Sequence, residues 1–135
     1  MLRLGGIYGP GRTSLVERVR SGAARVSPGS ARFTNRIHRD DAAAALAHLA
    51  ALPAAPSCHL GVDCAPAPEA EVLAWLAERL GVAPPCEDAP PAREETRRAT
   101  GNKRCSNARL LATGFRFRYP TYREGYEALL RERDA

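Results

Sequence analysis

Apolar residues recur along the chain at spacings that predict several short helices. The clearest helix covers residues 69–80, and Gly81 follows it as a C-terminal stop. Spacings of three and four residues place its apolar side chains on one face. These side chains are Val72, Leu73, Leu76 and Leu80. We therefore expect an amphipathic helix that packs on a core through this face.

Two further helices are predicted from capping boxes, in which a hydroxyl and a carboxylate three residues later bind each other's backbone N–H groups. Ser14 and Glu17 form the first, for a helix that ends near Gly22. Thr121 and Glu124 form the second, and they open the final helix of the chain.

Short polar residues predict two more helix starts. Asp40 or Asp41 is expected to cap an Ala-rich helix that runs to about Leu52, where prolines follow. Ser106 or Asn107 is expected to cap a short helix near the carboxyl end.

Strands are predicted to be few and short. Residues 2–4, 32–38 and 58–62 each read as a strand bounded by glycine, proline or polar residues. In residues 115–119, aromatic side chains alternate with arginines, which is typical of a strand with one buried face. Stacking on bases is the functional alternative for that segment, and a half-buried strand explains it as well.

The composition agrees with one globular domain over residues 1–135. Hydrophobic residues make up 44% of the chain and charged residues 26%. Residues 84–98 form a proline- and charge-rich loop, and no repeat or boundary between complete domains is visible. No apolar run is long enough for a membrane span, and the start lacks the layout of a signal peptide. A cytoplasmic protein without a membrane partner is expected.

Charge and cysteine content argue against two classes of site. The net charge of +5 comes almost wholly from arginines, which are spread along the chain apart from residues 93–104. A nucleic-acid partner is not expected, because such proteins cluster their basic residues on one face. The four cysteines form no C-x-x-C pair, and His38 has no second histidine at ligand spacing. No metal site is therefore predicted.

The glycine-rich start allows two interpretations. Residues 6–13 read G-x-x-x-x-G-R-T, one residue from a phosphate-binding P-loop, and residues 9–14 approach a dinucleotide-binding fingerprint. However, Arg12 replaces the P-loop lysine and Pro10 removes a backbone N–H donor. No acidic residue ends a second strand at the required distance. We favour a structural turn over a nucleotide cradle.

His38 also has two interpretations. A histidine beside the carboxylates of Asp40 and Asp41 can act as a general acid or base. The alternative is a loop whose aspartates only cap the next helix, and we favour it for both aspartates.

Residues 2–12 read L-R-L-G-G-I-Y-G-P-G-R, residues 35–41 read N-R-I-H-R-D-D, and residues 58–63 read C-H-L-G-V-D. Together with two later segments, they resemble the extended short-chain dehydrogenase/reductases of the NAD-dependent epimerase/dehydratase family. Residues 2–12 resemble its L-R-x-x-x-x-Y-G-P-G stretch, and residues 35–41 its I-H-x-D-D segment. Residues 58–63 resemble a late strand of the family. Residues 102–107 and 119–125 resemble closing segments of one epimerase-like branch. The resemblance covers nearly the whole chain and keeps its order.

The resemblance implies an α/β fold. It would be an incomplete NAD(P)-binding Rossmann-type fold: the last strands of the parallel sheet with the carboxyl-terminal substrate-binding helical region. The family's N-terminal G-x-x-G-x-x-G turn and its Y-x-x-x-K pair, both of which precede the Y-G-P-G stretch, do not occur in this sequence. The residue four before Lys103 is Ala99. The chain therefore resembles only the carboxyl-terminal part of the family's domain.

The resemblance also implies which residues would face ligands. The wall near the nicotinamide of NAD or NADP would be formed by Gly5, Gly6, Ile7 and Tyr8. Part of a pocket for a small-molecule substrate would be formed by Arg12, Arg36 and His38. No catalytic residue is carried over, because the Tyr–Lys pair that moves the proton is absent.

Three functions remain open from the sequence. The first is a truncated NAD(P)-dependent epimerase/dehydratase-like oxidoreductase that is inactive and holds its cofactor weakly on its own. The second is a non-enzymatic remnant that binds a partner, and the third is a P-loop-like nucleotide binder. The partner would be an N-terminal half or a second copy of the chain, because strands without neighbours expose edges that promote association.

Overall fold

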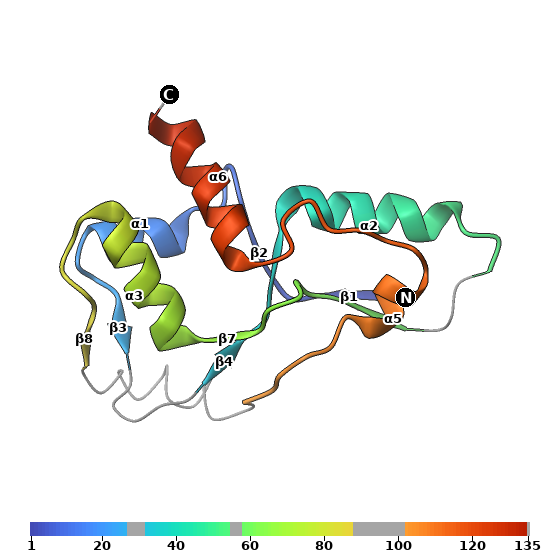
Figure 1. Ribbon diagram of the computed structural model, residues 1–135, viewed down its shortest axis with the longest axis horizontal. Coiled ribbons are helices and arrows are strands. Elements are labelled where there is room, and N and C mark those ends of the chain that lie inside the picture. Colours follow the sequence, from blue (N-terminus) through green and yellow to red (C-terminus); the bar gives the residue numbers. More distant parts are fainter. Residues whose placement is uncertain (27–31, 55–57, 88–101, 135) are drawn as a thin grey trace. The chain divides into compact units, whose positions relative to one another are not determined.

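The structure, a computed structural model, describes residues 1–26, 32–54, 58–87 and 102–134 (Figure 1). The chain divides into two compact units, which are considered separately below. Unit 1 contains Met1–Arg12, Asn35–Pro66 and Cys105–Ala135. Unit 2 contains Thr13–Thr34 and Ala67–Arg104.

Unit 1 is built on two parallel strand pairs. Strand β1 (Leu2–Leu4) pairs with β6 (His59–Gly61), and β2 (Gly6–Tyr8) pairs with β5 (Arg36–His38). Parallel pairing of strands that are distant in sequence is the hallmark of α/β folds, in which helices form the crossover connections. The predicted fold class is confirmed.

Gly5 marks the point where the first strand changes its partner. The Gly5 N–H donates to the Gly61 carbonyl (3.0 Å), whereas the Gly6 N–H donates to the Asn35 carbonyl (2.9 Å). The Asp63 N–H then donates to the Arg36 carbonyl, so β5 enters between β2 and the segment after β6. A β-carbon on Gly5 would lie 2.7 Å from the Asn35 oxygen, so only glycine fits here.

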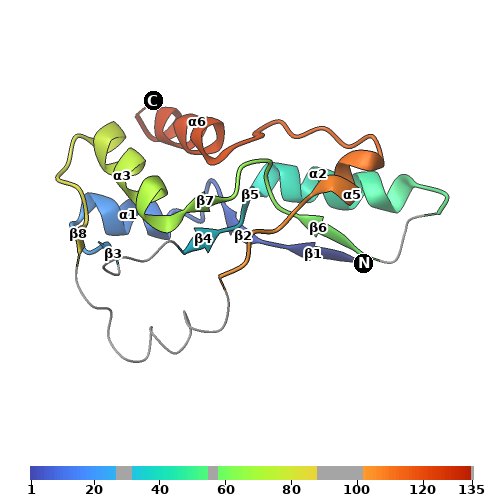
Figure 2. The ribbon, with the colours of Figure 1, turned by 60° about the horizontal axis from the view of Figure 1, so that its bottom comes forward.

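The described residues of unit 1 also form three helices: α2 (Arg39–Ala51), α5 (Ala108–Ala112) and α6 (Tyr122–Asp134). Figure 2 shows α2 and α5 near the pair formed by β1 and β6. A cluster of buried side chains joins α2, α5 and the segment after α5. It contains Ala45, Leu110 and Phe115, with Leu2, Leu49 and Phe117 packed against it.

The segment from residue 115 to residue 119 is not a strand, so that prediction is wrong. Phe115 and Tyr119 are buried, which explains the alternating pattern, but none of the described strands pairs with the segment. The Asp41 side chain, rather than a neighbouring strand, binds the backbone of this segment. Its carboxylate accepts hydrogen bonds from the backbone N–H groups of Arg118 and Tyr119, both at 2.8 Å.

The helix caps differ in part from the prediction. His38, not Asp40 or Asp41, is the N-cap of α2, and its Nδ1 accepts from the Asp40 N–H at 3.2 Å. At the start of α6 one half of the predicted capping box is present, because the Thr121 N–H donates to the Glu124 carboxylate at 3.0 Å. The Thr121 hydroxyl accepts from the Arg123 N–H at 3.2 Å, one residue earlier than predicted.

At the starts of the other two predicted helices, the side chain of the N-cap residue makes no hydrogen bond to the helix. Helix α1 (Ser14–Arg20) starts with Ser14 inside it; the N-cap is Thr13, without a side-chain hydrogen bond. Asn107 is the N-cap of α5, but its side chain does not bind the helix; it donates to the Val62 carbonyl instead.

Unit 2 packs α1 against α3 (Glu69–Leu80), the helix predicted most clearly. Its Val72, Leu73 and Leu76 are buried, and Gly81 ends it in a left-handed conformation with φ 64°. The strands in the described part of unit 2 have two residues each. They are β3 (Arg25–Val26), parallel to β8 (Cys86–Glu87), and β4 (Phe33–Thr34), antiparallel to β7 (Ala67–Pro68).

Two sequence predictions need comment here. The single strand expected over residues 32–38 is two strands, β4 and β5, which Asn35 separates and which pair in different units. Most of the predicted loop at 84–98 lies outside the described residues, and its start contains β8.

Candidate functional site

The residues predicted to line a cofactor lie in unit 1, on one continuous segment. Gly6 is exposed and Ile7 is half-buried. Tyr8, at the end of β2, is buried, with 5% of its surface exposed to solvent. A β-carbon added to Gly6 would meet only the Asn35 oxygen, at 3.5 Å, so the backbone here is open to close approach. Gly5 differs from these residues, because the space that its side chain would need is occupied by the Asn35 carbonyl oxygen and the Val62 side chain.

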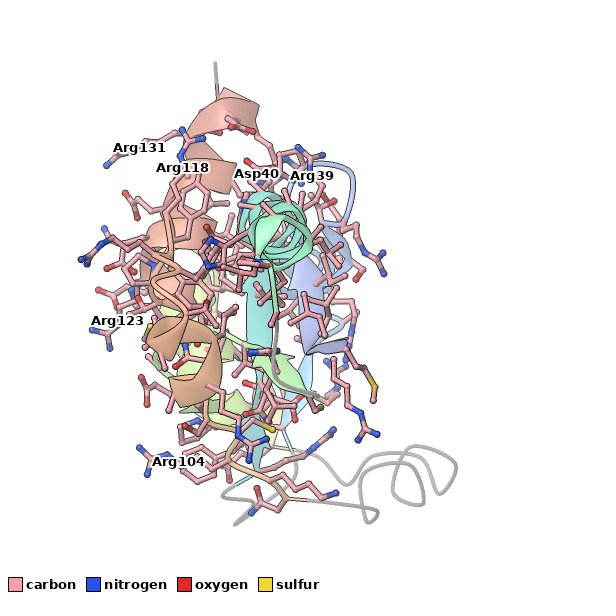
Figure 3. The ribbon with its side chains drawn as sticks, turned by 90° about the vertical axis from the view of Figure 1, so that its right-hand side faces the viewer. Arg39, Asp40, Arg104, Arg118, Arg123 and Arg131 are labelled. Carbon is pink, nitrogen blue, oxygen red and sulfur yellow. The ribbon has the colours of Figure 1, made fainter. Side chains whose placement is uncertain are left out.

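The glycine-rich motif after β2 forms a tight turn. The Arg12 N–H donates to the Gly9 carbonyl at 2.9 Å, and Gly11 has φ 80°. Proline followed by a residue of positive φ is the signature of a type II turn, which is the structural interpretation favoured above. The guanidinium of Arg39 donates to the Pro10 carbonyl at 2.7 Å and holds the turn against the start of α2, where Figure 3 labels Arg39 and Asp40.

Tyr8 is the centre of a buried group of aromatic rings. Its ring stacks on Tyr126 of α6, with centroids 4.2 Å apart, and meets the edge of His38 at 5.4 Å. The His38 ring in turn lies 4.1 Å from the ring of Tyr119. Aromatic contacts of this kind add to burial energy and fix ring orientations.

The Tyr8 hydroxyl is buried and has no hydrogen-bond partner among the described residues. Burial, followed by the nearby Tyr126 and Asp63, raises the pKa of Tyr8 far above its usual value. A phenol in this state holds its proton firmly, which does not suit the acid–base group of a hydride-transfer reaction.

The environment of His38 favours the neutral ring. Burial lowers the pKa of His38, although Asp40 and Asp41 act in the opposite direction. Because Nδ1 accepts the Asp40 N–H, the remaining proton of the neutral ring is assigned to Nε2. Gly9, with φ 143°, passes close to this nitrogen, and a β-carbon there would lie 3.3 Å from Nε2.

Arg36 reaches the same group of rings from β5. Its Nη1 donates to the Tyr126 hydroxyl at 3.0 Å, and its guanidinium carbon lies 6.0 Å from the centroid of that ring. Burial raises the pKa of Tyr126, and Arg36 partly offsets this rise.

Asp63 is the buried carboxyl beside Arg36. It retains 3% of its exposed surface and accepts the Ala65 N–H at 3.0 Å. Burial raises the pKa of Asp63 to about 6, against the lowering effects of the Ala65 hydrogen bond and Arg36. This carboxyl therefore titrates close to neutral pH, which is common at functional sites.

The structure thus brings together three of the predicted residues, Tyr8, Arg36 and His38, but not all of them. Arg12 is exposed on the turn, and no contact identified within the described part of the chain joins it to the others. Sequence reasoning missed Tyr126 and Asp63. Both lie in or beside segments that carried the family resemblance, and that proximity was the only available signal.

Two kinds of function find no support in the described residues. Within residues 1–26, 32–54, 58–87 and 102–134, no group of three or more His, Cys, Asp or Glu side chains could hold a metal ion. Over the same ranges, no helix combines the length and the apolar character that crossing a membrane requires.

Comparison with known proteins gives the fold a context. No family model matches the sequence, and no curated protein matches it either. Among solved structures, a protein of Methylobacillus flagellatus described as an NAD-dependent epimerase/dehydratase is 40% identical over 99% of this chain, with a TM-score of 0.76. The chain belongs to the NAD-dependent epimerase/dehydratase family. The predicted family is confirmed.

The chain spans about half the length of these solved relatives. It covers 47% of the Methylobacillus protein and 48% of a Silicibacter pomeroyi protein of unknown function, which is 34% identical over 97% of this chain with a TM-score of 0.80. It covers 44% of the UDP-glucose 4-epimerase of Thermus thermophilus, solved with NAD, which is 26% identical over 96% of this chain with a TM-score of 0.73.

The residues present fit part of a dinucleotide cofactor. The open backbone at Gly6 allows a flat ring to approach, and the unpartnered Tyr8 hydroxyl lies two residues away. The family's G-x-x-G-x-x-G turn, which would hold a pyrophosphate, does not occur in this sequence.

Proposed function

We propose that this chain forms the carboxyl-terminal half of an NAD(P)-dependent epimerase/dehydratase-type oxidoreductase. The observation that supports this most directly is the 40% identity over 99% of the chain to a protein of which the chain covers 47%. In this proposal, the remaining half of the enzyme supplies the pyrophosphate site and the Tyr–Lys pair.

Each predicted residue has a task in this proposal. Gly5, Gly6 and Ile7 form the wall beside the nicotinamide, because a backbone without bulky side chains admits a flat ring. Tyr8 supports that wall from below through its stack on Tyr126. The cofactor, when bound, supplies the hydride chemistry.

Arg36 and His38 belong to the substrate side of the proposed site. Arg36 carries a permanent positive charge, which suits a substrate with phosphate or carboxylate groups. His38 offers Nε2–H as a neutral hydrogen-bond donor. Arg12, which is exposed on the turn, would reach a substrate at the rim. We propose that the isolated chain has no turnover, because its sequence contains no Y-x-x-x-K pair.

The test is a fusion protein. The amino-terminal half of the Methylobacillus flagellatus protein is joined in front of Met1, and reduction or oxidation of NAD(P) is followed with nucleotide-sugar and carbonyl substrates. We expect turnover by the fusion and none by the 135-residue chain. Turnover by the isolated chain, or none by a folded fusion that binds NAD(P), would contradict the proposal.

A pair of variants makes the test specific to the site. Arg36→Ala in the fusion should lower kcat/KM at least about tenfold, because it removes a charge that faces the substrate. Arg131→Ala is the matched control. Arg131 on α6 is exposed and forms a surface ion pair with Glu127. This substitution should therefore leave kcat/KM within about twofold of the value for the unsubstituted fusion.

A further inference from the structure

One segment of unit 1, residues 105–123, is basic over its whole length. The chain has 15 acidic residues, but none of them occurs between Glu95 and Glu124. The segment instead carries four arginines, all of them exposed: Arg109, Arg116, Arg118 and Arg123. We call these four side chains the arginine strip. Figure 3 labels Arg118 and Arg123, which lie on the same side of unit 1.

The aromatic side chains of this segment face the protein interior. Phe115 and Tyr119 are buried, and Phe117 is half-buried against the cluster that joins α2 and α5. Arg116 and Arg118 alternate with these rings and are exposed. Because two of the three rings are buried, the segment presents positive charge to a partner and few ring faces.

The backbone under the arginine strip is held from outside the segment. The Asp41 carboxylate accepts from the N–H groups of Arg118 and Tyr119, both at 2.8 Å. The next residue, Pro120, accepts from the Cys64 N–H at 2.8 Å. Hydrogen bonds at three consecutive positions fix this part of the segment, so it loses little conformational entropy when a partner binds.

Two guanidinium groups of the strip lie over tyrosine rings. The guanidinium carbon of Arg118 is 5.3 Å from the ring centroid of Tyr119, and that of Arg123 is 5.6 Å from the ring centroid of Tyr122. The Arg123 Nε also donates to the Tyr122 hydroxyl at 3.2 Å. A tyrosine ring orients a guanidinium group without cancelling its charge.

The charge of most of the strip is not neutralised within the described part of the chain. None of the ion pairs found among the described residues involves Arg109, Arg116 or Arg118. Arg39 and Arg131, by contrast, lie beside the carboxylates of Asp40 and Glu127. The arginine strip is therefore a held, positively charged surface that suits an anionic partner.

We propose that the arginine strip is a docking surface for a short, extended and acidic segment of a partner protein. A guanidinium group binds a carboxylate through two parallel hydrogen bonds, so successive Asp and Glu side chains of such a segment can each bind one arginine of the strip. Clusters of arginines recognise acidic motifs in this way. Docking here requires neither NAD(P) nor turnover, so it is independent of the proposed function.

The surroundings of the strip favour a peptide over a nucleic acid. Helix α6, which follows directly, carries Glu124, Glu127 and Glu132, and these carboxylates would repel the phosphates of a duplex that extends along the helix. Single-stranded nucleic acids bind largely by stacking on exposed rings, whereas Phe115 and Tyr119 are buried. A short acidic peptide contacts the strip alone and meets neither obstacle.

The test measures binding of a defined acidic probe to the 135-residue chain. The probe is fluorescein-labelled octaglutamate, followed by fluorescence anisotropy, with octaglutamine as the uncharged reference peptide. We expect octaglutamate to bind and octaglutamine not to bind. Raising the salt concentration from about 50 mM to about 200 mM should weaken the binding, because the charges of the strip are exposed to solvent.

A pair of double variants assigns the binding to the strip. Arg116→Glu with Arg118→Glu should weaken octaglutamate binding at least about tenfold. Arg131→Glu with Arg133→Glu is the matched control, because it makes the same change in net charge at two exposed arginines of α6. The control should bind octaglutamate within about threefold of the wild type.

Several outcomes would overturn the docking surface. They are no binding of octaglutamate, equal binding of octaglutamine, and equal weakening by the two double variants. A DNA duplex of about two helical turns that binds more tightly than octaglutamate, and that the strip variant weakens, would identify a nucleic-acid surface instead. Self-association that the strip variant abolishes, measured by light scattering, would assign the strip to contacts between copies of the chain.

Circular dichroism and cooperative unfolding check that both double variants are folded. If the charge reversal prevents folding, Arg116→Gln with Arg118→Gln removes the charge at the same two positions. This milder variant should weaken octaglutamate binding at least about fivefold, and unchanged binding would overturn the proposal as well.

Discussion

The ring of Tyr8 occupies the space that a side chain at position 125 would need. A β-carbon on Gly125 would overlap the Tyr8 hydroxyl and lie 2.7 Å from the ring carbon that bears it. Gly125 is buried in α6, where glycine is otherwise a poor helix former. The close approach of α6 to β2 explains why glycine is found there.

Gly125→Ala should therefore destabilise the protein, although alanine favours helices. We expect a loss of about 1–3 kcal/mol in the free energy of unfolding, because the Tyr8 ring has to leave its stack on Tyr126. Urea denaturation followed by circular dichroism measures it. A gain in stability would show that the contact between the two residues is not formed.

Tyr8→Phe provides the complementary prediction. This variant removes a buried hydroxyl that has no partner among the described residues, so its stability should equal or exceed that of the wild type by up to about 1–2 kcal/mol. In the double variant, Gly125→Ala should cost less than it does alone, because the nearest clashing atom is gone. Additive effects in this double-mutant cycle would contradict the packing.

Asp41 is expected to be the most sensitive carboxylate for stability. Asp41→Ala leaves the N–H groups of Arg118 and Tyr119 without their acceptor in a buried position, which should cost about 2–4 kcal/mol. Asp40→Ala is the matched control. Asp40 is partly exposed and pairs with Arg39, so its loss should cost less than about 1 kcal/mol in the same denaturation experiment.

The raised pKa of Asp63 predicts a pH dependence of stability. The folded pKa of about 6 lies above the unfolded value of 3.8, so the folded state binds more protons between these values. Stability contributed by Asp63 is therefore present at low pH and is lost as the pH rises through about 6. His38 has the opposite effect, since its lowered pKa reduces stability as the pH falls below its unfolded value of 6.5.

Asp63→Asn separates the two effects. Asparagine can still accept the Ala65 N–H but does not titrate, so the difference in unfolding free energy between variant and wild type should shift in favour of the variant as the pH rises from about 5 to about 7.5. We expect a change on the order of 1–2 kcal/mol. A difference that stays constant over this range would show that Asp63 titrates normally.

NAD should bind weakly to the isolated chain. Calorimetry is expected to show a dissociation constant above about 100 µM, because the family's G-x-x-G-x-x-G turn, which would hold the pyrophosphate, does not occur in this sequence. Micromolar affinity would instead direct attention to the turn at residues 9–12.

Short-range features of this protein could be predicted from its sequence. The helix at residues 69–80 is confirmed, and so is the hydrogen bond from the Thr121 N–H to the Glu124 carboxylate. In each case the determining contacts span at most a few residues, so the pattern along the chain contains the information. The family was recognisable for a related reason, since its motifs are short segments in a constant order.

The tertiary structure decided the features that depend on distant partners. Asp41 resembles a helix cap in the sequence, yet its carboxylate binds backbone groups 77 and 78 residues away. The alternation of aromatic residues at 115–119 predicted a strand. The burial of alternate side chains produces the same pattern in a segment whose backbone is bound by the Asp41 carboxylate instead of a neighbouring strand. The rings of Tyr8, His38 and Tyr126 meet only after β2, β5 and α6 have packed, and no local spacing encodes that contact. Local preferences determine where elements begin and end, whereas burial and hydrogen bonding across the chain determine what each side chain does.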